Sequence, residues 1–202
     1  MTNDVTLAHR TLAELEAFLP VLDAAPKDVG VLKLLVRRPQ VDAREVLDRG
    51  ELDLTQGLVG DCWLARGSSR RPDRSANPDS QLNIMSHPMV EFLAQDPDRE
   101  PLAGDQLYLD LDLSHANLPA GSTLIFGDSD GVGDAGRPVI VVTEEPHTGC
   151  AKFVARFGVE AMRFVNGEHG KPRRLRGLCA RVVVPGVVRP GDRVVVTRPA
   201  TA

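Results

Sequence analysis

The sequence has few cysteines, few aromatic residues and no long hydrophobic run. Its three cysteines lack a Cys-x-x-Cys pair and form neither a secreted disulfide framework nor a zinc knuckle, so we expect a reducing, cytoplasmic environment. No apolar run approaches the ~18 residues that a membrane helix requires, and the N-terminus has no basic region followed by an apolar core. What remains, 42% hydrophobic and 26% charged residues over 202 positions, is typical of a globular chain of about one domain.

Charge is distributed unevenly along the chain. Residues 1–150 carry 13 Lys/Arg against 25 Asp/Glu, a net charge of −12, whereas residues 151–202 carry 11 against 3, a net charge of +8. A basic final quarter on an acidic body indicates a local site for a small anionic molecule; the alternative is a set of arginines on a solvated face. We expect neither nucleic acid nor a membrane as a partner.

The hydrophobic pattern predicts a mainly β protein with a few short peripheral helices. Alternation is strict over Gln106–Leu113, so its four leucines should face a core while Tyr108, Asp110 and Asp112 face water. Further strands are predicted at Val29–Val36, Thr123–Phe126, Val139–Thr143, Cys179–Val184 and Arg193–Thr197, the last two as a hairpin. Helices are predicted at Thr11–Leu22, Ser86–Gln95, Ala151–Phe157 and Val159–Val165. Short strands with Gly/Pro turns favour a β-barrel or sandwich over a parallel βαβ sheet.

Two loop segments need separate interpretation. Arg66–Pro78 is too polar to pack, and loops of this length usually have a function such as a lid or a binding edge. Segment 127–136 matches a nucleophile elbow and a dinucleotide fingerprint, but both need a helix directly afterwards, where Arg137-Pro138 and a β-branched run stand instead. Its aspartates resemble a calcium loop that lacks the acid at position 12. We interpret it as an acidic hairpin loop.

The segment Pro146–Phe153 carries the strongest chemical signal. Cys150 follows a Thr-Gly turn and precedes a predicted helix, which places its sulfur near unpaired backbone N–H groups and the positive end of the helix dipole. Lys152, Arg156 and His147 lie nearby and favour a thiolate in the same way. Such a thiolate suits a nucleophile, a sulfur carrier or a soft-metal ligand; the alternative is a small buried cysteine without a function.

Arginines of the final quarter are candidates for holding an anion, because the planar guanidinium suits phosphate. We expect the predicted hairpin to bring Arg176 and Arg181 close to the Cys150 loop. Cys179, beside Val182–Val184, is expected in the core, and Arg173 and Arg174 on a solvated patch.

Several segments resemble the MOSC family, named for the C-terminal domain of molybdenum-cofactor sulfurases, and in particular its short stand-alone bacterial members. The resembling segments are VLKLLVRRPQVDARE, GLVGDCW, QLNIM, AGDQLYLDLDLSHANLPAG and the stretch from HTGCAKF to PGDRV. The resemblance implies a closed β-barrel of the type first seen in the small barrel domain of pyruvate kinase. We therefore expect an N-terminal helical extension over residues 1–25 and a MOSC β-barrel domain over residues 26–202.

The same resemblance implies that the chain binds the molybdenum cofactor, molybdopterin, or carries sulfur for it. Cys150 falls on the family's cysteine, as metal ligand or sulfur carrier. Relatives deliver sulfur to the cofactor or reduce N-hydroxylated compounds, so the expected protein partner is a molybdoenzyme client or an electron donor. We expect no pyridoxal phosphate, because the chain has no room for the aminotransferase-like domain of full sulfurases. The candidate residues for phosphate and pterin are Arg176, Arg181, Arg66, Arg44, Asn83 and Lys152, and His147 is the candidate for orienting or protonating a substrate.

Two other functions fit the same residues. One is a non-catalytic barrel that binds an anionic ligand or a partner protein, with Cys150 inert. The other is a cysteine hydrolase that uses His147 and Cys150. The sequence supports the hydrolase less, because no carboxylate follows His147 to orient it, although Glu144 and Glu145 precede it.

Overall fold

The computed structural model describes residues 8–127 and 136–200, so the motifs predicted within 128–135 lie outside the described residues. Seven strands close into a barrel in the order β11-β7-β8-β9-β5-β6-β1, with β1 pairing back to β11. Neighbours are antiparallel except β5 and β6, which are parallel. The barrel strands are β1 Val29–Arg37, β5 Leu82–Ser86, β6 Leu107–Asp110, β7 Thr123–Gly127, β8 Val139–Val142, β9 Leu178–Val184 and β11 Arg193–Thr197. The predicted mainly β, closed-barrel fold is confirmed.

Four shorter strands lie outside the closed barrel. β2 (Glu45–Val46) pairs with the end of β1, while β3 (Gly50–Asp53), β4 (Gly57–Leu58) and β10 (Gly186–Val188) form a small separate sheet. The predicted hairpin of the last two barrel strands is wrong: β9 pairs with β5 and β8, and β11 pairs with β1 and β7. The chain turns away at Pro185 because β10 joins β3 before the chain returns to the barrel.

Two hydrophobic cores are separated by the wall of the barrel. Leu107 and Leu109 of β6 point into the barrel, where they pack among aliphatic side chains such as Leu32, Ile84 and Leu178. Tyr108 points the other way, and the prediction that it faces water is wrong: it is fully buried beneath the helices. Strand β6 also ends at Asp110 rather than Leu113. Burial on both faces stabilises this wall from two sides.

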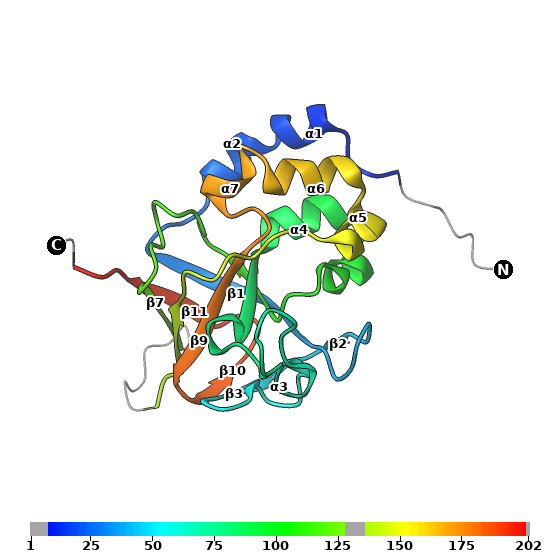
Figure 1. The fold of residues 1–202 in the computed structure, drawn as a ribbon. Helices are drawn as coiled ribbons and strands as arrows, with labels where there is room; N and C mark the ends of the chain where they lie inside the picture. Colours follow the sequence, from blue (N-terminus) through cyan, green and yellow to red (C-terminus); the bar gives the residue numbers. More distant parts are fainter. Residues whose placement is uncertain (1–7, 128–135, 201–202) are drawn as a thin grey trace.

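A layer of helices covers one end of the barrel and forms the second core (Figure 1). It consists of α1 Leu12–Ala17, α2 Leu19–Asp23, α4 His87–Ala94, α5 Ala151–Phe157, α6 Val159–Asn166, α7 Gly170–Arg173 and the 3₁₀ segment η2 Pro97–Ala103. The predicted helix Thr11–Leu22 is therefore two helices; Thr11 and Glu14 form a capping box on the first, and Pro20 lies in the first turn of the second. Leu15 of α1 and Leu22 of α2 pack into this layer. The domain boundary expected at residue 25 stays a prediction.

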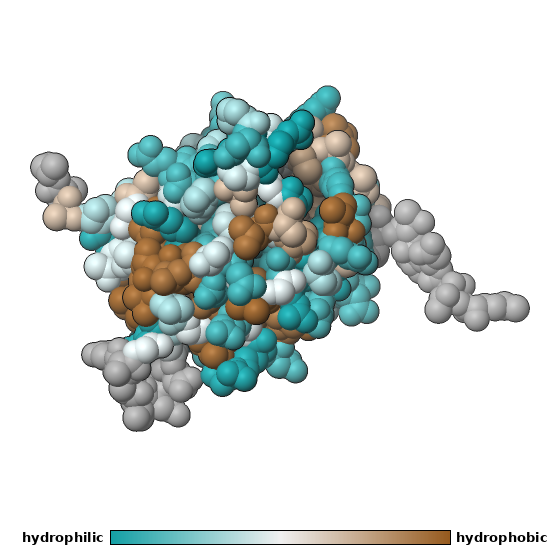
Figure 2. Space-filling view, turned by 60° about the horizontal axis from the view of Figure 1, so that its bottom comes forward, coloured by the Kyte–Doolittle hydropathy of each residue, from teal (hydrophilic) through white to brown (hydrophobic). Residues whose placement is uncertain are grey.

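The other end of the barrel carries the small sheet, α3 (Trp63–Arg66) and the 3₁₀ turn η1 (Pro78–Ser80) (Figure 1). Figure 2 shows that face of the molecule: hydrophobic side chains gather in one area and hydrophilic ones cover most of the remainder. Val183 and Val184 of β9 are among the exposed hydrophobic residues. In the described part of the chain, no helix combines the length and the apolar character needed to cross a membrane.

Candidate functional site

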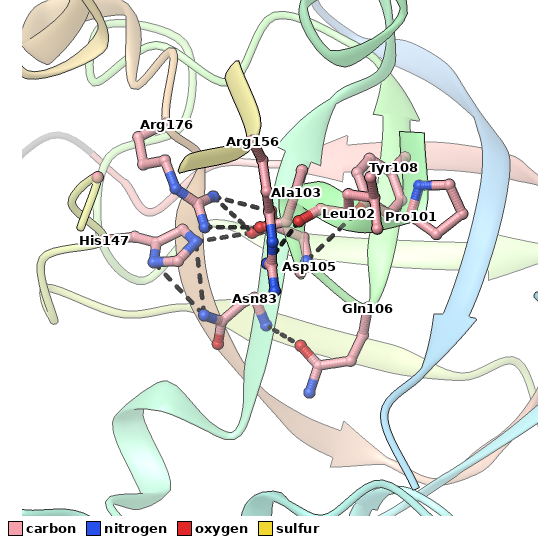
Figure 3. Close-up of polar contacts among 12 residues, drawn as sticks. Asn83, Pro101, Leu102, Ala103, Asp105, Gln106, Tyr108, His147, Arg156 and Arg176 are labelled. Carbon is pink, nitrogen blue, oxygen red and sulfur yellow. Dashed lines mark hydrogen bonds and ion pairs between the residues drawn. The ribbon is translucent and has the colours of Figure 1, made fainter. Parts of the chain in front are cut away.

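A buried carboxylate, Asp105, joins a histidine and an arginine where the helical layer meets the barrel. Asp105 lies in the turn between η2 and β6, His147 in the segment between β8 and α5, and Arg176 between α7 and β9. Nε2 of His147 lies 2.6 Å from Asp105 Oδ1, and Arg176 Nη1 donates to Oδ1 and Oδ2 at 3.0 and 2.8 Å (Figure 3). Arg176 Nη2 also donates to the Ala103 carbonyl at 3.1 Å. Three distant segments are thus fixed on one carboxylate.

The charges of this cluster compensate one another. Burial alone would raise the pKa of Asp105, but the Arg176 guanidinium and His147 outweigh it, so the pKa lies below its usual value and Asp105 is ionised. Burial and the nearby Arg176 lower the pKa of His147, against the opposite influence of Asp105, so the imidazole is neutral near pH 7. The cluster therefore contains one cation, one anion and one neutral proton carrier.

The hydrogen bonds assign the tautomer of His147. Because ionised Asp105 only accepts, the proton of the neutral ring is on Nε2, which leaves Nδ1 as an acceptor. Asn83 of β5 places its amide Nδ2 3.4 Å from both Nδ1 and Nε2 of His147, and its backbone N–H donates to Gln106 Oε1 at 2.8 Å (Figure 3). Asp105 therefore orients the imidazole, and Asn83 lies against it.

Cys150 opens into a cavity of about 240 Å³, which we call the cysteine cavity. Cys150 is the exposed N-cap residue of α5, as predicted, but its sulfur accepts no backbone hydrogen bond there. Cys62, half-buried, lines the same cavity. The cationic residues of the lining are Arg38, Arg44, Arg66, Lys152, Arg156 and Arg176, and its acidic residue is Asp42.

The cations of the cysteine cavity differ in how far they are neutralised. Arg38 is paired with buried Asp61, and Lys152 and Arg156 share Asp42 at 2.6 and 3.2 Å. Arg44 donates to the carbonyls of Ala43 and Pro101, and burial followed by repulsion from Arg156 and Arg38 lowers its pKa. The Arg66 guanidinium has no partner within residues 8–127 and 136–200, and Arg176 Nε is buried without one. The cavity therefore has donors left for an anionic ligand.

A second cavity of about 580 Å³ lies beside the first, and we call it the loop cavity. Arg66 and Asn83 line both cavities, and His147 lines only the loop cavity of the two. Trp63, Ser69, Arg74 and Cys179 are further lining residues. His147 and Arg176 also border a third cavity of about 230 Å³, so the Asp105 cluster lies at the meeting point of all three.

Most of the residues predicted for the site come together, but not all. The residues that line the cysteine cavity are Cys150, Lys152, Arg44, Arg66, Asn83 and Arg176. His147 lies outside this cavity, against Asn83, and lines the loop cavity. Arg181 does not join them, because β9 turns its side chain outward, where it is exposed. Cys179 is buried as predicted, and burial raises its pKa to about 12.

The solvated patch predicted for Arg173 and Arg174 is wrong for Arg174, whereas Arg173 takes part in an exposed ion pair. Arg173 forms a two-point ion pair with Asp23 of α2, at 2.7 and 2.9 Å. Arg174 is half-buried and donates to the Leu118 carbonyl at 2.6 Å. Both arginines therefore tie α7 to neighbouring segments.

Asp105 is the functional residue that sequence reasoning missed. Its partners are 42 and 71 positions away in the sequence, so no local pattern joins the three residues. The available signals were the resembling segment AGDQLYLDLDLSHANLPAG, which contains Asp105, and the pair Gly104-Asp105 before the most regular strand, which a simple turn also explains.

The hydrolase alternative gains a carboxylate but lacks its central contact. Asp105 orients His147 as a catalytic base requires, which the residues around His147 did not indicate. Within the described parts of the chain, however, no hydrogen bond joins His147 to Cys150, and the two residues line different cavities. The imidazole contacts Asp105 and Asn83 instead.

Comparison with known proteins shows the fold and nothing finer. No protein-family model and no curated protein sequence matches the chain. The solved structure of the YuaD protein from Bacillus subtilis has a TM-score of 0.53 and 18% identity, over 83% of this chain and 95% of that one. The structure of a hypothetical protein has a TM-score of 0.51 and 20% identity, over 87% and 70%. The chain thus has the fold of these proteins.

Proposed function

We propose that this chain is a MOSC-type protein that binds the molybdenum cofactor, or carries sulfur for it, through Cys150. The resemblance of its segments to that family suggests the ligand, and the barrel fold is compatible with it. The observation that carries the proposal is the exposed Cys150 thiol in a cavity lined by six cationic side chains and one acidic one.

The residues of the cavity fit that ligand. Molybdopterin carries a phosphate and a dithiolene-bound metal, which need guanidinium donors and a soft sulfur ligand. Among the described residues, nothing pairs with the Arg66 guanidinium, and the buried Nε of Arg176 has no hydrogen-bond partner. Cys150 would be the metal ligand or the sulfur carrier. Arg66, Arg176, Arg44 and Lys152 would hold the anionic part, and Asn83 would contact the pterin.

The chain's own residues supply proton handling and orientation. When bound, the cofactor supplies the two-electron chemistry that reduces an N-hydroxylated compound, with electrons from a separate donor protein. His147 is neutral and is held by Asp105, so it can orient a substrate or exchange a proton. Asn83 lines both cavities and contacts the imidazole of His147, which lines the loop cavity.

Metal and pterin analysis of three proteins tests this proposal. Wild type, Cys150→Ala and the control Cys179→Ala are purified from a host that makes molybdopterin, and molybdenum and pterin are measured per chain. We expect molybdenum and pterin in wild type and in Cys179→Ala, since that control removes only a buried sulfur. We expect molybdenum to be lost in Cys150→Ala. A persulfide on Cys150, without resident metal, supports the sulfur-carrier form.

The same measurements can reject the proposal. If wild type has neither molybdenum, pterin nor persulfide, the alternative of a non-catalytic barrel that binds another anion replaces it. If Cys150→Ala retains the wild-type amount of molybdenum and pterin, Cys150 is not the ligand.

A further inference from the structure

The segment Arg66–Pro78 forms one wall of the loop cavity and is held in a defined shape. The backbone N–H groups of Ser68, Arg71 and Arg74 donate to the carbonyls of Arg74, Ser68 and Arg71, at 3.3, 3.3 and 3.1 Å. The Ser75 N–H and hydroxyl both donate to Asp73 Oδ1. This segment is therefore a closed local turn with a defined backbone, from which its exposed side chains extend.

The arginines of this segment fall into two groups. Arg70 pairs with Glu145 at 2.8 Å, and Arg71 pairs with Asp73 at 3.5 Å. Arg66 and Arg74 line the loop cavity, and neither guanidinium has a hydrogen bond or ion pair to any described residue. Arg74 also holds a left-handed backbone conformation, φ +59°, which is uncommon for an arginine. The two unpaired cations thus belong to the cavity.

Neutral groups and the Arg70–Glu145 ion pair, in which the two charges compensate each other, complete the lining beside these two cations. Ser69 contributes a hydroxyl, which can donate to an oxyanion as well as accept. Trp63, the only tryptophan of the chain, contributes an apolar surface, and the neutral His147 faces the same space. Guanidinium and hydroxyl donors beside an apolar ring suit a small organic molecule with a phosphate or carboxylate group.

We propose that the loop cavity binds a small organic oxyanion through Arg66 and Arg74. This site goes beyond the function proposed above, because Arg74 lines only the loop cavity of the two and Cys150 does not line it, although Arg66 is shared by both cavities. Its ligand would lie next to His147, on the far side of Asn83 from the cysteine cavity.

The fluorescence of Trp63 gives a readout specific to this cavity. Phenyl phosphate and benzoate are titrated into wild type at constant ionic strength, with the heat of binding measured in parallel. The variants are Arg74→Asn, which removes the charge while asparagine tolerates the left-handed backbone, and the matched control Arg71→Asn. A third variant, Cys150→Ala, separates this site from the cysteine cavity.

We expect saturable binding of at least one probe, weakened roughly tenfold or more by Arg74→Asn, the usual effect of removing a charge-assisted hydrogen bond. Arg71→Asn and Cys150→Ala should bind as wild type does, whether or not molybdenum is found in the protein. Preference for phenyl phosphate or for benzoate identifies the oxyanion. Absence of saturable binding, equal loss in both arginine variants, or loss in Cys150→Ala alone would overturn the proposal.

Discussion

Nε2 of His147 lies 2.6 Å from Oδ1 of Asp105, a carboxylate that is fully buried and also receives two hydrogen bonds from Arg176. This contact joins the loop before α5 to the turn before β6, so the position of the histidine depends on a residue next to a barrel strand. Because Asp105 compensates Arg176 and orients His147 at once, it supports both the stability of the site and its chemistry.

Replacing Asp105 by asparagine should destabilise the protein strongly. Asp105→Asn removes the counter-charge of the buried Arg176 guanidinium, and breaking a buried ion pair costs about 3–5 kcal/mol. Urea unfolding followed by circular dichroism measures this loss of free energy of unfolding. The control Asp23→Asn removes the exposed ion pair with Arg173 and should have a much smaller effect. An equal loss of unfolding free energy in the two variants would show that the buried Asp105–Arg176 pair stabilises the protein no more than the exposed Asp23–Arg173 pair does.

The stability of the protein should decrease as the pH falls below about 6.5. The pKa of His147 is lowered from its ordinary value of 6.5 by burial, so between the folded and the ordinary pKa the unfolded chain binds more protons. Unfolding is therefore favoured as the pH falls through this window. In His147→Gln, which does not titrate there, the decrease should be smaller. Urea unfolding at pH 7.5, 6.5, 5.5 and 4.5 measures how the free energy of unfolding changes with pH in each protein. The same pH dependence in wild type and His147→Gln would contradict the assignment of a neutral His147.

The three cysteines should differ in their reaction with a thiol reagent. Cys150 is exposed, Cys62 is half-buried and Cys179 is 2% exposed with its pKa raised to about 12. Reaction of the native protein with iodoacetamide, followed by peptide mass spectrometry, should label Cys150 first and leave Cys179 unmodified until urea is added. Fast labelling of Cys179 in the native state would contradict the burial of that strand residue.

Removing the carboxylate of Asp42 should strengthen anion binding in the cysteine cavity. Asp42 Oδ1 is shared by Lys152 and Arg156, so an anionic ligand competes with it for both cations. We expect Asp42→Asn to bind pyrophosphate several-fold more tightly than wild type in isothermal titration calorimetry. Glu45→Gln is the control, since Glu45 pairs with Arg37 and does not line the cavity. Unchanged or weaker binding in Asp42→Asn would show that its carboxylate does not compete with ligands.

The parts of the fold that were predictable have strong local patterns. The alternation around Leu107 and Leu109 located β6, and the glycines at 158 and 167 located the ends of α5 and α6. The burial of Tyr108 was not predictable, because an aromatic residue on the same strand face as Gln106, Asp110 and Asp112 fits a water-facing surface equally well. The helices that cover it come from distant segments, 12–23 and 151–166, and only their packing decides which face of β6 meets water.

The sequence by itself determined where the reactive groups of this protein lie along the chain: Cys150 at a helix start, cationic residues after it, and a polar loop after Trp63. These are local facts, since caps, turns and charge runs depend on neighbouring residues. Only the tertiary structure decided that Asp105 holds His147 and Arg176, that Arg181 points away, and that Arg66 stands between two cavities. Closing the barrel through the β1–β11 pairing sets these distances, and no local pattern records which side chains a closed sheet brings together.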